Sequence, residues 1–182
     1  MTMQHEFAGI CLESGALFPN RWKISVDMVA YIKAGTSDAE IAEASRLATL
    51  AYQKIHFWLN TSLDNIMLVD VANQDDCLLA MHVENPGMFI PNATLTDDRL
   101  AQLLHAKMAA LSEGHLVIGK ISITSDQSAL GYTFDPVDTG YTLPTTVSDY
   151  LTDTPTLHTT PWWHRNDGFC MEIPVGEDGK TL

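Results

Sequence analysis

The sequence has few cysteines and few basic residues, and it has no long apolar run. Its three cysteines, Cys11, Cys77 and Cys170, are far apart, and their odd number favours free thiols over a disulfide framework. No stretch approaches the roughly 20 apolar residues of a membrane span, and residues 1–12 lack the basic start and apolar run of a signal peptide. These absences predict a cytoplasmic protein without membrane contact.

The shortage of basic residues leaves the chain strongly acidic. It has 10 Lys and Arg residues against 23 Asp and Glu residues, a formal net charge of −13. Such a charge repels the phosphates of nucleic acids and of anionic membranes, so we expect no direct nucleic-acid binding. Two interpretations of the charge stay open. It keeps the folded chain soluble, or it attracts a basic partner or imitates a phosphate backbone.

The length and composition predict one folded domain followed by an arm. The chain has 182 residues, of which 46% are hydrophobic, enough to build a core. We place an α+β core at residues 1–135 and an extended arm at residues 136–182, where threonine is frequent and prolines interrupt any periodicity. Trp162, Trp163 and Phe169 are expected to anchor that arm on the core or on a neighbouring subunit.

The first half of the core shows two strand signals and one helix signal. Apolar and polar residues alternate over 22–32, and the apolar run 7–12 is expected to pair with that strand as a hairpin with a long loop. Ser37 and Glu40 form a capping box for a helix that ends near Leu59. The apolar stripe of this helix comprises Ile41, Ala44, Ala48, Ala51, Ile55 and Trp58, widened by Leu47, Leu50 and Phe57.

The second half repeats this order. Residues 66–71 and 77–83 flank turn-forming residues and predict a buried hairpin at the centre of the sheet. Thr94 or Thr96 is expected to cap a second helix, and residues 116–124 and 129–134 to form a last hairpin. The stripe of the second helix is Leu100, Leu103, Leu104, Met108 and Leu111, with Gly114 at its end.

These elements predict a single α+β domain in the order ββαββαββ. A mainly antiparallel sheet would be covered on one face by two helices, with an irregular C-terminal arm. The order helix, strand pair, helix, strand pair, together with acidity and small size, resembles the secretion chaperones that hold type III effectors. The resemblance is one of architecture, carried by no motif, and the leading strands and the long tail depart from it.

Three residues are candidates for acid–base chemistry. Asp70 lies inside an apolar run, where a carboxylate must find a partner or have a raised pKa. His82 shares one strand face with Glu84, an arrangement that orients an imidazole but is more common as a satisfied structural histidine. His164 belongs to a C-terminal group of His, Asp and Cys residues whose spacing matches no site signature.

The sequence lacks the common site motifs. It has no Cys-x-x-Cys, nucleophile elbow, Walker loop, dinucleotide-binding glycine pattern or calcium loop, so we expect no metal and no cofactor. This absence does not exclude an enzyme, although it favours a binding protein. The residues expected to bind a ligand or to form an interface are Trp162, Trp163, His164 and Phe169.

Three functions are therefore compatible with the sequence. The first is a non-enzymatic adaptor that binds a protein partner or a second copy of itself through an acidic and aromatic surface. The second is a small-molecule-binding protein or enzyme with a pocket between the sheet and the C-terminal arm. The third is a phage- or plasmid-type inhibitor that presents carboxylates in place of phosphates, ranked last because its acidic residues are scattered.

Overall fold

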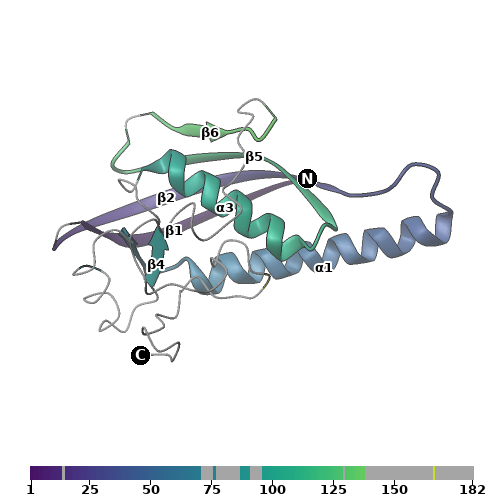
Figure 1. Cartoon of the computed structure of the whole chain (residues 1–182), viewed down its shortest axis with the longest axis horizontal. Helices are drawn as coiled ribbons and strands as arrows, with labels where there is room; N and C mark the ends of the chain where they lie inside the picture. Colours follow the sequence, from purple (N-terminus) through teal and green to yellow (C-terminus); the bar gives the residue numbers. More distant parts are fainter. Residues whose placement is uncertain are drawn as a thin grey trace, which may run out of the picture.

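The protein has the predicted α+β fold, in the predicted order of strands and helices (Figure 1). The computed structural model describes residues 1–13, 15–70, 76, 87–90, 96–128, 130–137 and 166. Within them, the strands form one six-stranded sheet with the order β4-β3-β1-β2-β5-β6. The elements are β1 (Thr2–Glu13), β2 (Ala16–Ala30), α1 (Asp38–Ser62), β3 (Ile66–Asp70), β4 (Gly87–Ile90), α3 (Asp97–Ser112), β5 (Leu116–Ser125) and β6 (Tyr132–Phe134).

The β1–β2 hairpin is longer, and its turn shorter, than the sequence predicts. The antiparallel register runs from Thr2 opposite Asp27 to Glu13 opposite Ala16, so the expected long loop is wrong. Gly15 adopts a φ of 77° in this tight turn, a conformation that glycine adopts without steric cost. Pro19 lies inside β2, because β5 joins β2 only from Trp22 onward and leaves this stretch without a partner on that side.

The β1–β2 hairpin, and not the predicted hairpin at 66–83, forms the centre of the sheet. β3 lies second from one edge, where it pairs parallel with β1 and with β4. Alternation and turn signals do not reveal such pairing, because the connection from β1 to β3 passes through β2 and α1. The antiparallel pairs are β1–β2, β2–β5 and β5–β6, of which β5–β6 is the predicted last hairpin. Residues 77–83 lie outside the described residues.

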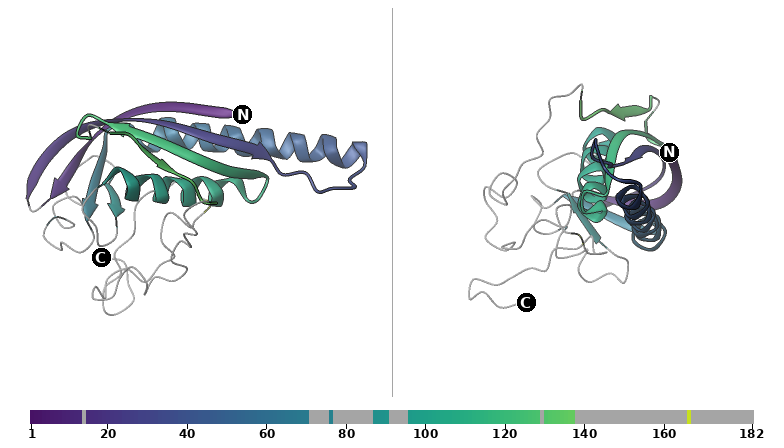
Figure 2. Two further views of the ribbon diagram at one scale, coloured as in Figure 1. Left: turned by 90° about the horizontal axis from the view of Figure 1, so that it is seen from above. Right: turned by 90° about the vertical axis from the view of Figure 1, so that its right-hand side faces the viewer.

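One face of the sheet forms the core with both helices. Alternate residues of the strands point to this face, and Figure 2 shows the sheet curving around the helices. Both helices contribute buried side chains to the same cluster, as predicted. The strand residues in this buried cluster are Met3, Phe7, Cys11, Trp22, Ile24, Val26, Met28, Ile66, Leu68, Leu116, Ile118, Ile121, Ile123 and Phe134.

The opposite face of the sheet is largely polar over β1, β2 and β5. Lys23 Nζ lies 3.0 Å from Glu6 Oε1, and Thr2 donates a hydrogen bond of 2.9 Å to Asp27. Both pairs are exposed, so they add little to stability. Within the described part of the chain, neither helix has the length and apolar character needed to cross a bilayer.

The two helix starts differ in their capping. At α1 the predicted capping box is present, and Glu40 Oε2 accepts from both the backbone N (2.9 Å) and the hydroxyl (2.6 Å) of Ser37. These bonds, first that from the hydroxyl, lower the pKa of Glu40. At α3 the N-cap is Thr96, one of the two threonines predicted for it, but its side chain makes no capping bond.

Candidate functional site

The residues that the sequence singled out fall almost entirely outside the part of the chain that the structure describes. Asp70 ends β3, but its side chain is not among the described ones. His82 and the four candidates near the C-terminus lie in undescribed segments, so their roles stay predictions. These four are Trp162, Trp163, His164 and Phe169.

On α1, the predicted widening of the apolar stripe is wrong for Leu50 and Phe57, whose side chains are exposed. Leu50 is 48% exposed, Phe57 is 69% exposed, and Leu47 is half-buried. We call the two exposed residues, Leu50 and Phe57, the outer apolar row. Leu50 and Phe57 are seven residues apart, so they lie nearly two turns apart and point in about the same direction. An exposed phenylalanine in mid-helix is an unfavourable use of apolar surface unless something covers it.

The inner side of α1 explains why the outer apolar row stays uncovered. Ala48, Ala51, Ile55 and Trp58 recur at steps of three and four and are buried against the core. Their direction fixes the rotation of the helix about its axis. Leu50 and Phe57 then lie more than a quarter turn away from the buried stripe, at about 100° per residue. The same sequence pattern that buries one side of α1 therefore exposes the other.

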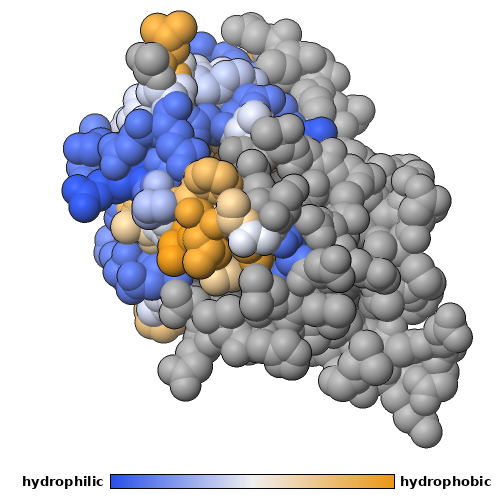
Figure 3. All heavy atoms as spheres, turned by 90° about the vertical axis from the view of Figure 1, so that its left-hand side faces the viewer, coloured by the Kyte–Doolittle hydropathy of each residue, from blue (hydrophilic) through white to orange (hydrophobic). Residues whose placement is uncertain are grey.

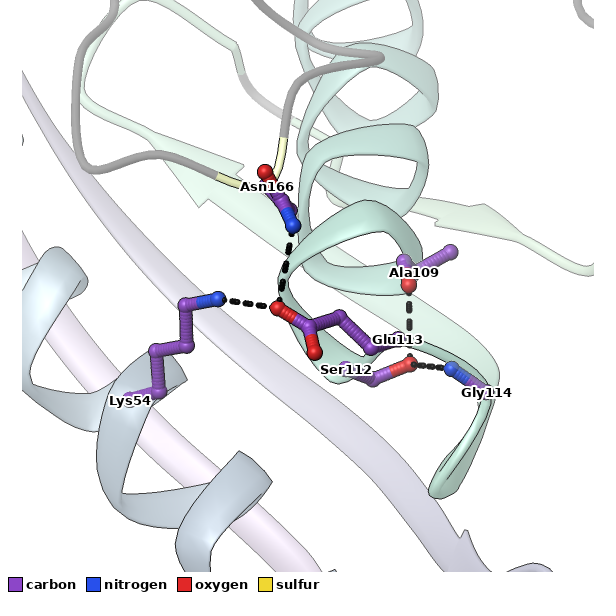
Figure 4. Close-up of polar contacts among 6 residues, drawn as sticks. All are labelled: Lys54, Ala109, Ser112, Glu113, Gly114 and Asn166. Atoms are coloured by element: carbon purple, nitrogen blue, oxygen red, sulfur yellow. Dashed lines mark hydrogen bonds and ion pairs between the residues drawn. The ribbon is translucent and has the colours of Figure 1, made fainter.

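An ion pair between the helices borders the outer apolar row. Lys54 Nζ of α1 lies 2.7 Å from Glu113 Oε1, directly after α3, and Asn166 donates a 3.1 Å hydrogen bond to the same oxygen (Figure 4). The bond from Lys54, followed by its charge, lowers the pKa of Glu113. Glu113 is left-handed, with a φ of 51°, and ends α3 just before the predicted Gly114.

A second ion pair lies on α1 itself. Arg46 Nη2 is 2.7 Å from Glu43 Oε1, and its Nε donates to Glu43 Oε2 at 2.8 Å. This bidentate contact is the main cause of the lowered pKa of Glu43. The charged groups beside the outer apolar row thus engage one another, and the row itself offers contact area for docking.

A further apolar area lies at the end of the molecule where the β1–β2 hairpin turns. Leu17 and Phe18 of β2 are exposed there, and Figure 3 shows apolar side chains gathered on this end. Phe18 is 43% exposed, less than the 69% of Phe57, so we place the candidate site on α1.

Two partly buried histidines are features that sequence reasoning missed. His105 of α3 contacts the carbonyl oxygen of Ile118 through Nε2 at 3.0 Å, and its ring packs against Phe134 in a T-shaped arrangement. His5 of β1 lies beneath α1. Burial is the first cause of the lowered pKa of both histidines. The alternation of β1 could have revealed His5, because residues 3, 5 and 7 share one face of the strand and Met3 and Phe7 are core residues.

The described residues contain no group of three or more His, Cys, Asp or Glu side chains placed to hold a metal ion. Both histidines are only partly buried, and His5 lines a small cleft together with Glu6 and Lys23. No protein-family model and no curated protein matches this chain. The exposed outer apolar row is therefore the feature from which we argue a function.

Proposed function

We propose that the chain is a non-enzymatic protein-binding protein that docks a partner through the outer apolar row of α1. The observation that carries the proposal is Phe57, 69% exposed and two helical turns from exposed Leu50. Helices that bind a groove on a partner use anchors at this spacing. Full burial of a Phe or Leu side chain is worth about 1.5–3 kcal/mol, so two such anchors supply much of the energy of a specific complex.

Anchors of this kind need a rigid support. The buried stripe of α1 holds the helix on the core, and Lys54 ties it to the end of α3. A preformed helix loses little conformational entropy on binding. The proposal therefore needs no rearrangement of the chain.

The charge of the chain indicates the chemistry of the partner. At −13 per chain, two copies repel each other, whereas a basic protein is attracted. We propose a partner with an apolar groove and a basic rim, and not a second copy. Its association rate should fall as salt is added, because the long-range attraction is screened.

The experiment compares variants of the tagged full-length chain, purified from the cells that produce it and measured by native mass spectrometry. Phe57→Glu and Leu50→Glu each place a charge in the outer apolar row. Ser45→Glu is the matched control, because Ser45 is exposed on the same helix about 140° around from Leu50. All three variants gain one negative charge.

We expect a stoichiometric partner with the wild type and with Ser45→Glu, and its loss with Phe57→Glu and Leu50→Glu. Light scattering of the purified chain should give a monomer. A partner retained equally by all variants would contradict the proposed surface. A dimer that Phe57→Glu dissociates would contradict the basic partner and assign the surface to self-association.

A further inference from the structure

A polar cleft of about 520 Å³ lies at the start of α3, away from the outer apolar row. Its walls are the beginning of α3, the early part of β2, the end of β5 and the segment from β5 to β6. The residues that give it its chemistry are Asn20, Asp97, Asp98, Ser125 and Tyr132. Its volume falls within the range of small-molecule sites.

Asn20 is the residue in the cleft whose hydrogen bonds are incomplete. It is only 8% exposed, and its Oδ1 accepts from the backbone N of Arg21 (2.9 Å) and of Asp126 (3.1 Å). These two bonds fix the orientation of the amide, because only the oxygen can accept them. Among the described residues, nothing accepts a hydrogen bond from the remaining polar atom, Nδ2. Nδ2 is not fully buried, so it can donate a hydrogen bond to a ligand in the cleft that supplies an acceptor.

The start of α3 adds both donors and acceptors. Because the Thr96 side chain makes no capping bond, the backbone N–H groups of Asp97 and Asp98, which line the cleft, are open to a ligand. Asp97 Oδ2 accepts from the hydroxyl of Ser125 at 2.9 Å. Its other oxygen and the neighbouring Asp98 carboxylate can accept from a ligand, while Tyr132 contributes an aromatic wall.

We propose that this cleft binds a neutral polyhydroxylated small molecule, such as a monosaccharide. Each hydroxyl both donates and accepts, so the several hydroxyls of one such molecule can donate to Asp98 and accept from Asn20. A simple ammonium ion has no acceptor for Asn20. No Lys or Arg side chain is among the described residues lining the cleft, which disfavours phosphate or carboxylate ligands.

The test is an NMR titration of the full-length chain with glucose, galactose, mannose and myo-inositol at millimolar concentrations. Methylammonium chloride and sodium phosphate are the competing probes. Asn20→Asp keeps the oxygen that accepts from Arg21 and Asp126 but removes the Nδ2 donor, and Asn60→Asp is the matched change at an exposed position of α1. Asp98→Asn is a second variant, for use if Asn20→Asp does not fold.

We expect at least one of the four polyols to shift the amide signals of Asn20, Asp98 and Gly131 saturably. Asn20→Asp and Asp98→Asn should each weaken that binding about tenfold, and Asn60→Asp should leave it unchanged. The proposal is overturned if no polyol shifts these signals, if only methylammonium or phosphate does, or if both cleft variants bind like the wild type. None of these outcomes bears on partner binding at Phe57, so the two proposals fail separately.

Discussion

Helices α1 and α3 are built on similar apolar patterns but serve the fold differently. α3 buries nine of its 16 residues, whereas α1 buries five of its 25. α3 lies against β5, β6 and α1, so most of its sides are covered. The length and apolar content of a helix therefore do not measure its share of the core. The apolar residues of α1 that stay outside the core form the surface that we assign to a partner.

The largest expected difference comes from removing one leucine from each helix. Leu104 of α3 is fully buried, so Leu104→Ala should lower the free energy of unfolding by about 2–5 kcal/mol, because it leaves a cavity. Leu50→Ala on α1 should cost about 0.5 kcal/mol or less. Urea unfolding of both variants measures this difference. Equal losses would mean that Leu50 belongs to the core.

The two helix starts should respond differently to loss of the N-cap hydroxyl. Ser37→Ala removes the hydroxyl that bonds Glu40 at α1 and should cost about 1 kcal/mol. Thr96→Ala should cost less, because that side chain makes no capping bond at α3. Hydrogen exchange of the first-turn amides reports each start locally. A larger increase in exchange at α3 in Thr96→Ala than at α1 in Ser37→Ala would contradict this prediction.

His105 of α3 should contribute to the loss of stability at low pH. Burial holds the pKa of His105 below its ordinary value of 6.5, and among the described residues its buried Nδ1 has no partner. The unfolded chain binds this proton at higher pH than the folded chain does, so stability present above about pH 6.5 should fall as the pH is lowered. His5 acts in the same direction beneath α1.

His105→Gln keeps a side-chain donor for Ile118 but cannot titrate. It should therefore lose less stability than the wild type between about pH 7.5 and about pH 5.5 in urea unfolding. An unchanged loss in this variant would show that His105 does not contribute to the acid sensitivity.

The smallest effect on stability is expected from the ion pair between α1 and the end of α3. Lys54→Gln removes the 2.7 Å ion pair with Glu113, which is partly exposed, and should cost roughly a few tenths of a kcal/mol. The cost should shrink further in high salt. Thermal unfolding at low and high salt checks it. A loss as large as that of Leu104→Ala would show that the pair holds α1 in place.

Local signals in the sequence predicted the elements well. The alternation over 22–32, the capping box at Ser37 and Glu40, and the stripe from Leu100 to Leu111 each correspond to observed structure. These patterns depend on neighbours in the chain, which a sequence displays directly. Pairing between strands depends on residues that are far apart in the chain, and the sequence does not display it directly. The central position expected for residues 66–71 was wrong for that reason.

Surfaces were harder to predict than elements. Leu50 and Phe57 look like core residues in the sequence, and only the rotation of α1 on the core shows that they are exposed. The cleft at Asn20 joins residues more than a hundred positions apart, such as Asn20 and Asp126, so no local motif marks it. The candidates Asp70, His82 and His164 stay predictions.

The most direct test of the docking surface is photo-crosslinking in the cells that produce the chain, with a photoreactive phenylalanine analogue at position 57, 50 or 45. We expect one dominant crosslinked partner from positions 57 and 50 and none from position 45. Crosslinks of equal yield from position 45, or none from position 57, would contradict the claim that the outer apolar row binds a partner.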